Sequence, residues 1–200
     1  MFWPRYIAAV RAQPNQHRGD HRDAQSRPPA SDARSSFRPT VGGRESHLMT
    51  APLDRSGQPA PLLDDAGIAE LLRSARRIAV VGASSNPARP SHGVFRTLIA
   101  AGYECVPVNP NETTVEGIPA VATLAEAAAA LGGHIDIVDV FRRPEVTEEI
   151  AREAVAVGAG ALWLQLGVVN EETARIAADG GLAVVMDRCT AIEIRRVGRD

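Results

Sequence analysis

The sequence contains no lysine, and all 22 of its basic residues are arginine. This absence excludes pyridoxal phosphate and other Schiff-base enzymes, which need a catalytic lysine, and Walker A loops, which need a lysine for their phosphates. The only cysteines, Cys105 and Cys189, lie far apart with no histidine pair nearby, so the sequence indicates neither a zinc site nor a disulfide framework. No apolar run after the first residues approaches the roughly 18 residues that a membrane span requires.

The first quarter of the chain lacks a sustained apolar period. Residues 1–48 carry eight arginines against four acidic residues, and such a segment cannot bury enough apolar surface to offset its ordering entropy. An arginine-rich, acid-poor leader is also typical of a targeting peptide or a nucleic-acid tail, whereas Met49 resembles a translation start. We expect residues 1–48 to be a disordered leader or an upstream-start extension, and residues 49–61 to be a polar lead-in.

The remainder of the chain is acidic. Residues 49–200 contain fourteen arginines against twenty aspartates and glutamates, which is not the composition of a nucleic-acid-binding domain. We therefore expect a cytoplasmic protein that binds neither nucleic acid nor a membrane.

Five apolar runs of strand length alternate with helical patterns. The runs are RIAVVGA from 77, YECVPVN from 103, HIDIVDVF from 134, ALWLQLG from 161 and LAVVMDR from 182, and the helical patterns cover 62–75, 92–102, 124–132, 144–158 and 170–180. A further short strand is possible near 118–121. Strands that are apolar at nearly every position and alternate with helices predict an α/β fold: a doubly wound, mainly parallel, five- or six-stranded, Rossmann-like sheet over residues 62–200.

The stretch VVGASSNPARPSHGV, residues 80–94, follows the first predicted strand. In this architecture the carboxyl ends of the strands form the ligand crevice, and a helix N-terminus there offers free N–H groups to a phosphate. Ser84 and Ser85 add hydroxyl groups, and Arg89 can pair with a phosphate at two points. The loop lacks the later glycines of a G-x-G-x-x-G motif, so an ordinary connecting loop is the alternative interpretation.

The other strand ends supply further candidates. The second strand ends in Val108-Asn109-Pro110-Asn111, without the acid that usually holds the ribose of NAD, which makes an NAD site less favoured. Asp139 and Arg142 end the third strand, and Gln165 is a polar amide within the fourth that needs a partner or a ligand.

Two residues are candidates for catalysis. Cys189 is a candidate nucleophile and His92 could contact an anion, but a buried thiol and a capping histidine are the alternatives. We find no nucleophile, base and orienting group that form a set.

Five blocks in order, IAVVGASSNPARPS, CVPVNP, DIVDVFRRPE, LWLQLGVVNEE and VVMDRCTAIE, resemble the small bacterial CoA-binding proteins. Their Rossmann-like domain is similar to the CoA-binding domain of the succinyl-CoA synthetase alpha subunit. The resemblance implies that coenzyme A lies across the carboxyl ends of the strands. The residues it implies as contacts are Gly82, Ser84, Ser85, Arg89, Val108, Asn109, Pro110, Val140, Phe141, Arg142 and Gln165.

We thus expect a module that binds coenzyme A or an acyl-CoA and has no chemistry of its own. The alternatives are an NAD(P)-dependent enzyme that uses the same crevice and a thiol-based role in which Cys189 forms a mixed disulfide with CoA. Expected partners are a second copy in a homo-oligomer and an acyl-CoA enzyme.

Overall fold

A computed structural model describes residues 62–198 of the protein. The predictions for residues 1–48 and 49–61 lie outside the described residues, and the boundaries expected for the domains stay predictions. None of the helices within 62–198 is both long enough and apolar enough to cross a membrane.

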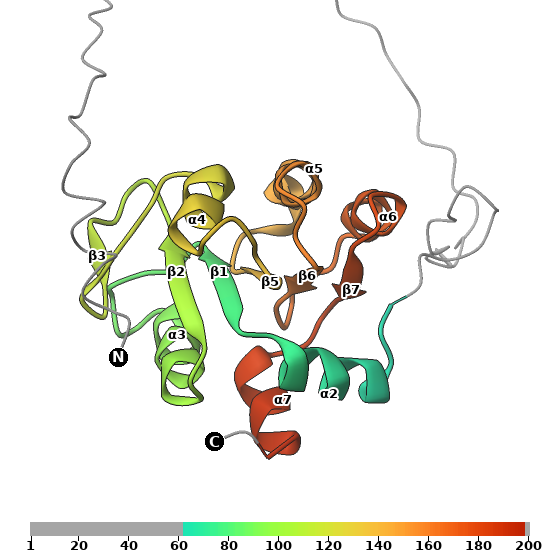
Figure 1. The fold of residues 1–200 in the computed structure, drawn as a ribbon, viewed down its shortest axis with the longest axis horizontal. Helices are drawn as coiled ribbons and strands as arrows, with labels where there is room; N and C mark the ends of the chain where they lie inside the picture. The colour runs from blue at the N-terminus through green and yellow to red at the C-terminus, as the bar shows by residue number, and fades with distance from the viewer. Residues whose placement is uncertain (1–61, 199–200) are drawn as a thin grey trace, which may run out of the picture. The chain divides into compact units, whose positions relative to one another are not determined.

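The centre of the fold is a parallel sheet of five strands in the order β2-β1-β5-β6-β7 (Figure 1). Its strands are β1 (Arg77–Val81), β2 (Glu104–Val108), β5 (Ile137–Val140), β6 (Ala161–Leu164) and β7 (Ala183–Val185). Nearly every strand residue is buried, because helices cover both faces of the sheet and each strand is apolar at most positions. The predicted doubly wound, Rossmann-like α/β fold is confirmed.

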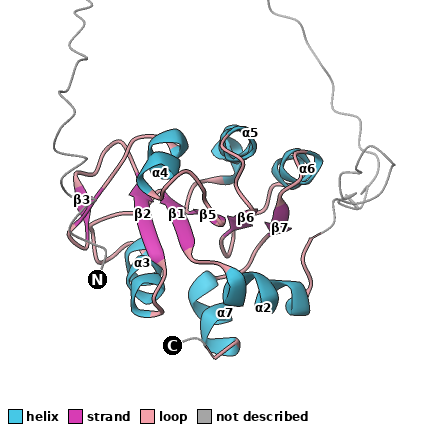
Figure 2. Ribbon diagram, in the orientation of Figure 1, coloured by secondary structure: helices cyan, strands magenta, loops and turns pink. Residues whose placement is uncertain are grey.

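Helices pack on both faces of the sheet (Figure 2). One face carries α2 (Asp65–Ser74), α3 (Pro90–Ala100) and α7 (Thr190–Arg196), and the other carries α4 (Leu124–Ala130), α5 (Thr147–Ala156) and α6 (Glu171–Asp179). A short 3₁₀ helix, η1 (Pro144–Val146), precedes α5. Helix α7 was not predicted from the sequence beyond a possible helix start at Cys189, and α3 begins two residues earlier than expected, with Pro90 in its first turn.

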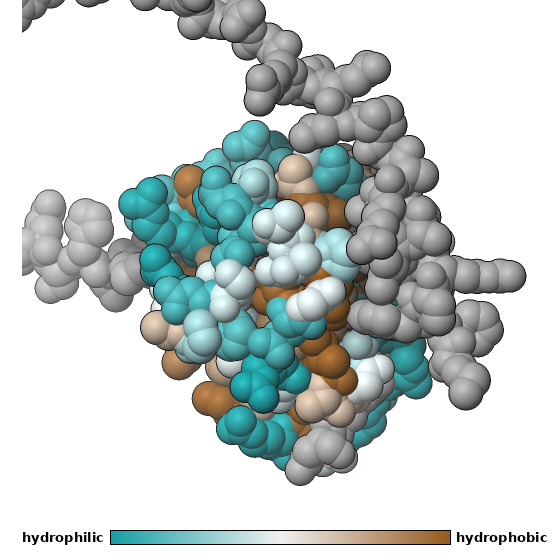
Figure 3. Space-filling view, turned by 90° about the vertical axis from the view of Figure 1, so that its left-hand side faces the viewer, coloured by the Kyte–Doolittle hydropathy of each residue, from teal (hydrophilic) through white to brown (hydrophobic). Residues whose placement is uncertain are grey.

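Both edges of the sheet are partly covered. The segment predicted as an additional strand forms a separate antiparallel hairpin of β3 (Thr114–Val115) and β4 (Ile118–Pro119), and Val121 makes a single parallel bridge to Val108 of β2. At the other edge Leu62 bridges Val184 of β7. On the β2 side, hydrophilic residues surround a band of hydrophobic ones (Figure 3).

The strand order creates a switch point between β1 and β5. From β1 the chain continues into α3 on one face of the sheet, whereas from β5 it continues through η1 into α5 on the opposite face. The two loops therefore diverge above the carboxyl ends of neighbouring strands, and in open α/β sheets ligands bind at this place.

Candidate functional site

A cavity of about 740 Å³ opens at the carboxyl ends of the strands. Loops after β1, β5, β6 and β7 form its walls, together with the tip of β2. It brings together seven of the eleven residues implied by the sequence: Gly82, Ser84, Arg89, Asn109, Phe141, Arg142 and Gln165.

The other four predicted residues lie around this cavity rather than in its wall. Val108 and Pro110 line a second, smaller hollow of about 280 Å³, and Arg142 lines both hollows. The backbone N–H of Ser85 donates to the side chain of Glu112, in the loop after β2. Val140 is fully buried within β5 and lines neither hollow, because β1 and β6 flank it and helices cover its two faces.

The loop after β1 is held largely by its own polar groups. Gly82 has a φ of 84°, in the left-handed region, and its N–H donates to Val108 O of β2 at 2.9 Å. Asn86 Oδ1 accepts the N–H of Ala88 at 2.9 Å, and Asn86 N donates to Ser84 Oγ at 3.2 Å. The N–H groups of Gly82, Asn86 and Ala88 are thus already used to shape the loop.

An acidic side chain that the sequence argument missed also contacts this loop. Glu112 Oε1 accepts the hydroxyl of Ser84 at 2.9 Å and the N–H of Ser85 at 3.0 Å. These hydrogen bonds, those from Ser85 foremost, hold the pKa of Glu112 below its usual range. The inference that no acid lies near the tip of the second strand is therefore wrong. Glu112 lies four residues beyond β2 in the sequence, and its side chain reaches the loop after β1.

Asn109 has a structural role. Its Nδ2 donates to Ala83 O at 2.8 Å, and its Oδ1 accepts the N–H of Asn111 at 3.1 Å, as a turn-forming asparagine does. Together with Glu112, it fastens the loop after β2 to the loop after β1.

Three arginines line the cavity with free charges. Among residues 62–198, the side chains of Arg89, Arg142 and Arg143 form no hydrogen bond or ion pair with another residue. Arg188, by contrast, bonds Glu193 and Asp65, both at 3.0 Å, and does not line the cavity. Three uncompensated guanidinium groups around one cavity create a positive potential that attracts anions.

A buried polar network supports the floor of the cavity. Gln165 Nε2 donates to Asp139 Oδ1 at 2.7 Å and to Thr190 Oγ1 at 2.6 Å, and Thr190 Oγ1 donates to Asp139 Oδ2 at 3.1 Å. Burial raises the pKa of Asp139 to about 7, although the two hydrogen bonds oppose this. With both amide protons of Gln165 used, its carbonyl oxygen is the amide atom left for a ligand.

The two cysteines differ in environment. Burial, and secondarily Asp139, raises the pKa of the Cys105 thiol far above its usual range. Cys189 is half-buried at the start of α7 and lines the cavity. None of the described residues lining the cavity is a histidine, so Cys189 has no imidazole base beside it.

His92 joins two loops. Its Nδ1 donates to Ser84 O at 3.1 Å and its Nε2 lies 3.0 Å from Glu116 Oε1 of the β3–β4 turn. It is buried and does not line the cavity, so it supports the loop.

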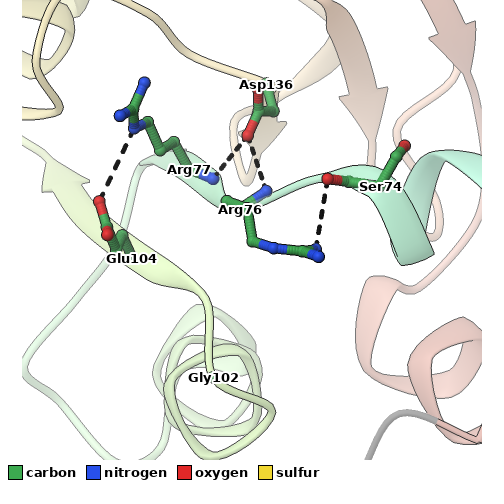
Figure 4. Close-up of a pocket in the computed structure, with 6 residues that line it drawn as sticks. All are labelled: Ser74, Arg76, Arg77, Gly102, Glu104 and Asp136. Carbon is green, nitrogen blue, oxygen red and sulfur yellow. Dashed lines mark hydrogen bonds and ion pairs between the residues drawn. The ribbon is translucent and has the colours of Figure 1, made fainter.

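A separate hollow of about 390 Å³ lies at the amino ends of the strands (Figure 4). Its polar groups satisfy one another: Asp136 Oδ2 accepts the N–H groups of Arg76 and Arg77, Arg77 pairs with Glu104, and the Arg76 guanidinium donates to carbonyls at the end of α2, including Ser74 O. These contacts join the ends of α2, β1 and β2 and use the polar groups that line this hollow.

Several lining residues were not among the sequence candidates. They are Pro90, Val94, Arg143, Pro144, Leu166, Gly167, Val168 and Ile192. Arg143 could have been found, since it follows Arg142 in the FRRPE block, whereas Leu166 and Ile192 read as ordinary apolar residues.

Comparison with known proteins identifies the family. The family model described as "CoA binding domain" matches residues 76–195. The uncharacterized protein YneT of Bacillus subtilis (strain 168) is 42% identical over 127 residues, which are 64% of this chain and 91% of YneT.

Solved structures share this fold. The crystal structure of Prb, a PH1109 protein redesigned for binding, is similar with a TM-score of 0.65 and 32% identity, over 71% of this chain and 97% of Prb. A hypothetical protein from Pyrococcus horikoshii OT3 is similar with a TM-score of 0.63 and 33% identity, over 68% of this chain and 92% of that protein. The sequence resemblance is thus confirmed, and the chain belongs to the CoA-binding domain family.

Proposed function

We propose that this protein binds coenzyme A or an acyl-CoA in the cavity between the loops after β1 and β5. The observation that carries the proposal is the set of three unpaired arginines, Arg89, Arg142 and Arg143, around a cavity at the switch point of the sheet. A pyrophosphate and a 3′-phosphate are the anions of CoA, and bidentate guanidinium contacts suit both. Family membership supports the same ligand.

The two hollows suggest how such a ligand would lie. The smaller one offers apolar surface from Val108, Pro110 and Ile150 to the adenine base, and Arg142 stands between both hollows, where phosphates would pass. The pantetheine arm would then run along the larger cavity past Gln165. The free carbonyl oxygen of Gln165 can accept an amide N–H, which pantetheine has.

An NAD(P) enzyme is the second candidate, and one observation favours it more than the sequence did. The carboxylate of Glu112 lies beside the loop after β1, where an NAD site carries the acid that holds a ribose hydroxyl. A module without chemistry of its own, a homo-oligomer, an acyl-CoA enzyme as partner and a cytoplasmic location stay predictions.

Thermal unfolding of the full chain with CoA, 3′-dephospho-CoA and NAD tests the proposal. We expect CoA to raise the unfolding midpoint, dephospho-CoA to raise it less and NAD to leave it unchanged. A ligand at 100 times its dissociation constant adds about 2.7 kcal/mol to the free energy of unfolding, which is readily measured. A shift with NAD alone would replace the proposal by its alternative, and no shift with any of the three would refute both.

The variant Arg89→Ala locates the site in the same experiment. Loss of a charge-assisted phosphate contact should weaken CoA binding about tenfold to a hundredfold. The matched control is Arg195→Ala, because Arg195 lies in the last turn of α7 and does not line the cavity. Arg188 is a poorer control, since its removal breaks ion pairs with Asp65 and Glu193.

The variant Glu112→Gln separates the two candidate ligands. Glutamine keeps an oxygen that accepts from Ser84 and Ser85, so the loop stays in place while a negative charge near the ligand phosphates is removed. We expect CoA to bind roughly two- to fivefold more tightly, as measured by titration calorimetry. Weaker binding of NAD by this variant would instead indicate that Glu112 accepts a ribose hydroxyl.

A further inference from the structure

The lining of the larger cavity changes character along the strand order. The loops after β1 and β5, at one end, contribute Ser84, Arg89, Arg142 and Arg143. The loop after β6 and the segment from β7 into α7, at the other end, contribute mainly apolar residues, among them Leu166, Val168 and Ile192. Because β6 and β7 follow β5 in the sheet, the cationic and apolar walls occupy successive parts of one cavity.

Two of the apolar residues are unusually exposed. Leu166 is 65% and Ile192 53% exposed, and both are among the large hydrophobic residues that the described part of the chain leaves in contact with solvent. Single exposed leucines are common on protein surfaces. Two large apolar side chains that line the same cavity, however, form an apolar surface that can bind an apolar group of a ligand. Cys189 lies in the same wall and adds a soft, weakly polar group.

The order of groups in an acyl-CoA matches this gradient. Its anionic phosphates come first, the polar pantetheine arm follows, and the thioester with its acyl chain forms the far end. With the phosphates beside the arginines and pantetheine beside Gln165, the far end reaches the loops after β6 and β7. We propose that Leu166, Val168 and Ile192 form a binding surface for the acyl chain, so that the preferred ligand is an acyl-CoA rather than free CoA. This inference rests on the proposed function.

Affinity across a series of ligands tests the proposal. Titration calorimetry of the full chain with CoA, acetyl-, butyryl- and hexanoyl-CoA should show binding that tightens with chain length. A fully buried methylene is worth a factor of about four. Because Leu166 and Ile192 cover the acyl chain from one side only, we expect the affinity to rise about twofold per methylene. This amounts to about fifteenfold between acetyl- and hexanoyl-CoA.

Two substitutions assign the effect to this surface. In Leu166→Ser combined with Ile192→Ser, the affinity should no longer depend on chain length, while the affinity for free CoA stays within about twofold. The control is Leu62→Ser, which changes an exposed leucine outside the cavity and should keep the full dependence.

Cys189 provides a second readout that does not depend on affinity. Because Cys105 is buried with a raised thiol pKa, Cys189 is the cysteine that an alkylating reagent reaches first. At saturating ligand, hexanoyl-CoA should slow alkylation of Cys189 at least several times more than acetyl-CoA does, and neither thioester carries a free thiol that would consume the reagent.

The outcomes separate this inference from the function on which it rests. If no CoA species binds, the proposed function fails and the acyl surface with it. If CoA binds but affinity is independent of chain length and Cys189 is protected equally by acetyl-CoA and hexanoyl-CoA, only the acyl surface is refuted. If the double variant instead abolishes a dimer of the wild type without any chain-length effect, Leu166 and Ile192 belong to an interface between two copies.

Discussion

At pH 8 the variant Asp139→Asn is expected to be more stable than the wild-type protein by about 4 kcal/mol, and below pH 4 the two are expected to be nearly equal. Asp139 is completely buried in β5, and its strand neighbours are Val80 and Trp163. Burial of the charged carboxylate raises its pKa to about 7, against about 3.8 for an exposed aspartate. Asparagine has nearly the same shape and carries no charge at any pH.

The sign of the pH dependence follows from the direction of the pKa shift. A carboxyl whose pKa is raised in the folded state keeps its proton there while the unfolded chain releases it. Wild-type stability should therefore fall by about 1.4 kcal/mol per pH unit between pH 4 and pH 7, and then level off. The stability that Asp139 contributes by keeping its proton is fully present below the pKa of the carboxyl in the unfolded chain. It is lost as the pH rises through the pKa of Asp139 in the folded protein.

Urea unfolding of both proteins at several pH values between 4 and 9 measures the difference directly, because other titrating groups are common to both and cancel. The introduced asparagine can accept from Gln165 through its Oδ1 and donate to Thr190 Oγ1 through its Nδ2, which replaces the hydrogen bond that Thr190 donates to Asp139, so the cavity floor should be preserved. A difference that stays constant with pH would mean that Asp139 is ionised at an ordinary pKa in the folded protein.

The strands and the position of the site followed from local pattern. Runs such as RIAVVGA are apolar on successive residues, which suits a strand covered on both faces. Gly82 lies at the carboxyl end of this run, and Arg89 lies in the loop that follows. Placement of Arg142 and Gln165 at the same cavity needed only the rule that parallel strands end at one edge.

Features created by contacts between distant segments could not be predicted in this way. Glu112 meets Ser84 and Ser85 across 28 and 27 residues of sequence, and Asp139 meets Thr190 across 51. Neither pairing leaves a periodicity in the sequence. Helix α7 was missed because it is short and its apolar residues, Ala191, Ile192 and Ile194, show too few turns for a clear helical period.

The variant Gly82→Ala is expected to lower the free energy of unfolding by about 3 kcal/mol and to abolish CoA binding. Gly82 has a φ of 84°, where an alanine costs about 1 kcal/mol or more. A Cβ atom at this position would also lie 2.6 Å from the carbonyl oxygen of Phe141 and 3.0 Å from Cδ of Arg142. The backbone of Phe141 cannot move aside easily, because its N–H donates to Val81 O at 2.8 Å, and such overpacking adds about 1 to 3 kcal/mol.

Gly93→Ala is the matched control for this substitution. Gly93 lies inside α3 with an ordinary helical backbone, and a Cβ there would meet no atom within 4 Å, so alanine should stabilise the protein by about 0.5 to 1 kcal/mol. Denaturant unfolding should thus show that Gly82→Ala lowers the free energy of unfolding and that Gly93→Ala raises it. If Gly82→Ala kept wild-type stability and CoA affinity, the close approach of the loops after β1 and β5 would not be the feature that shapes the cavity.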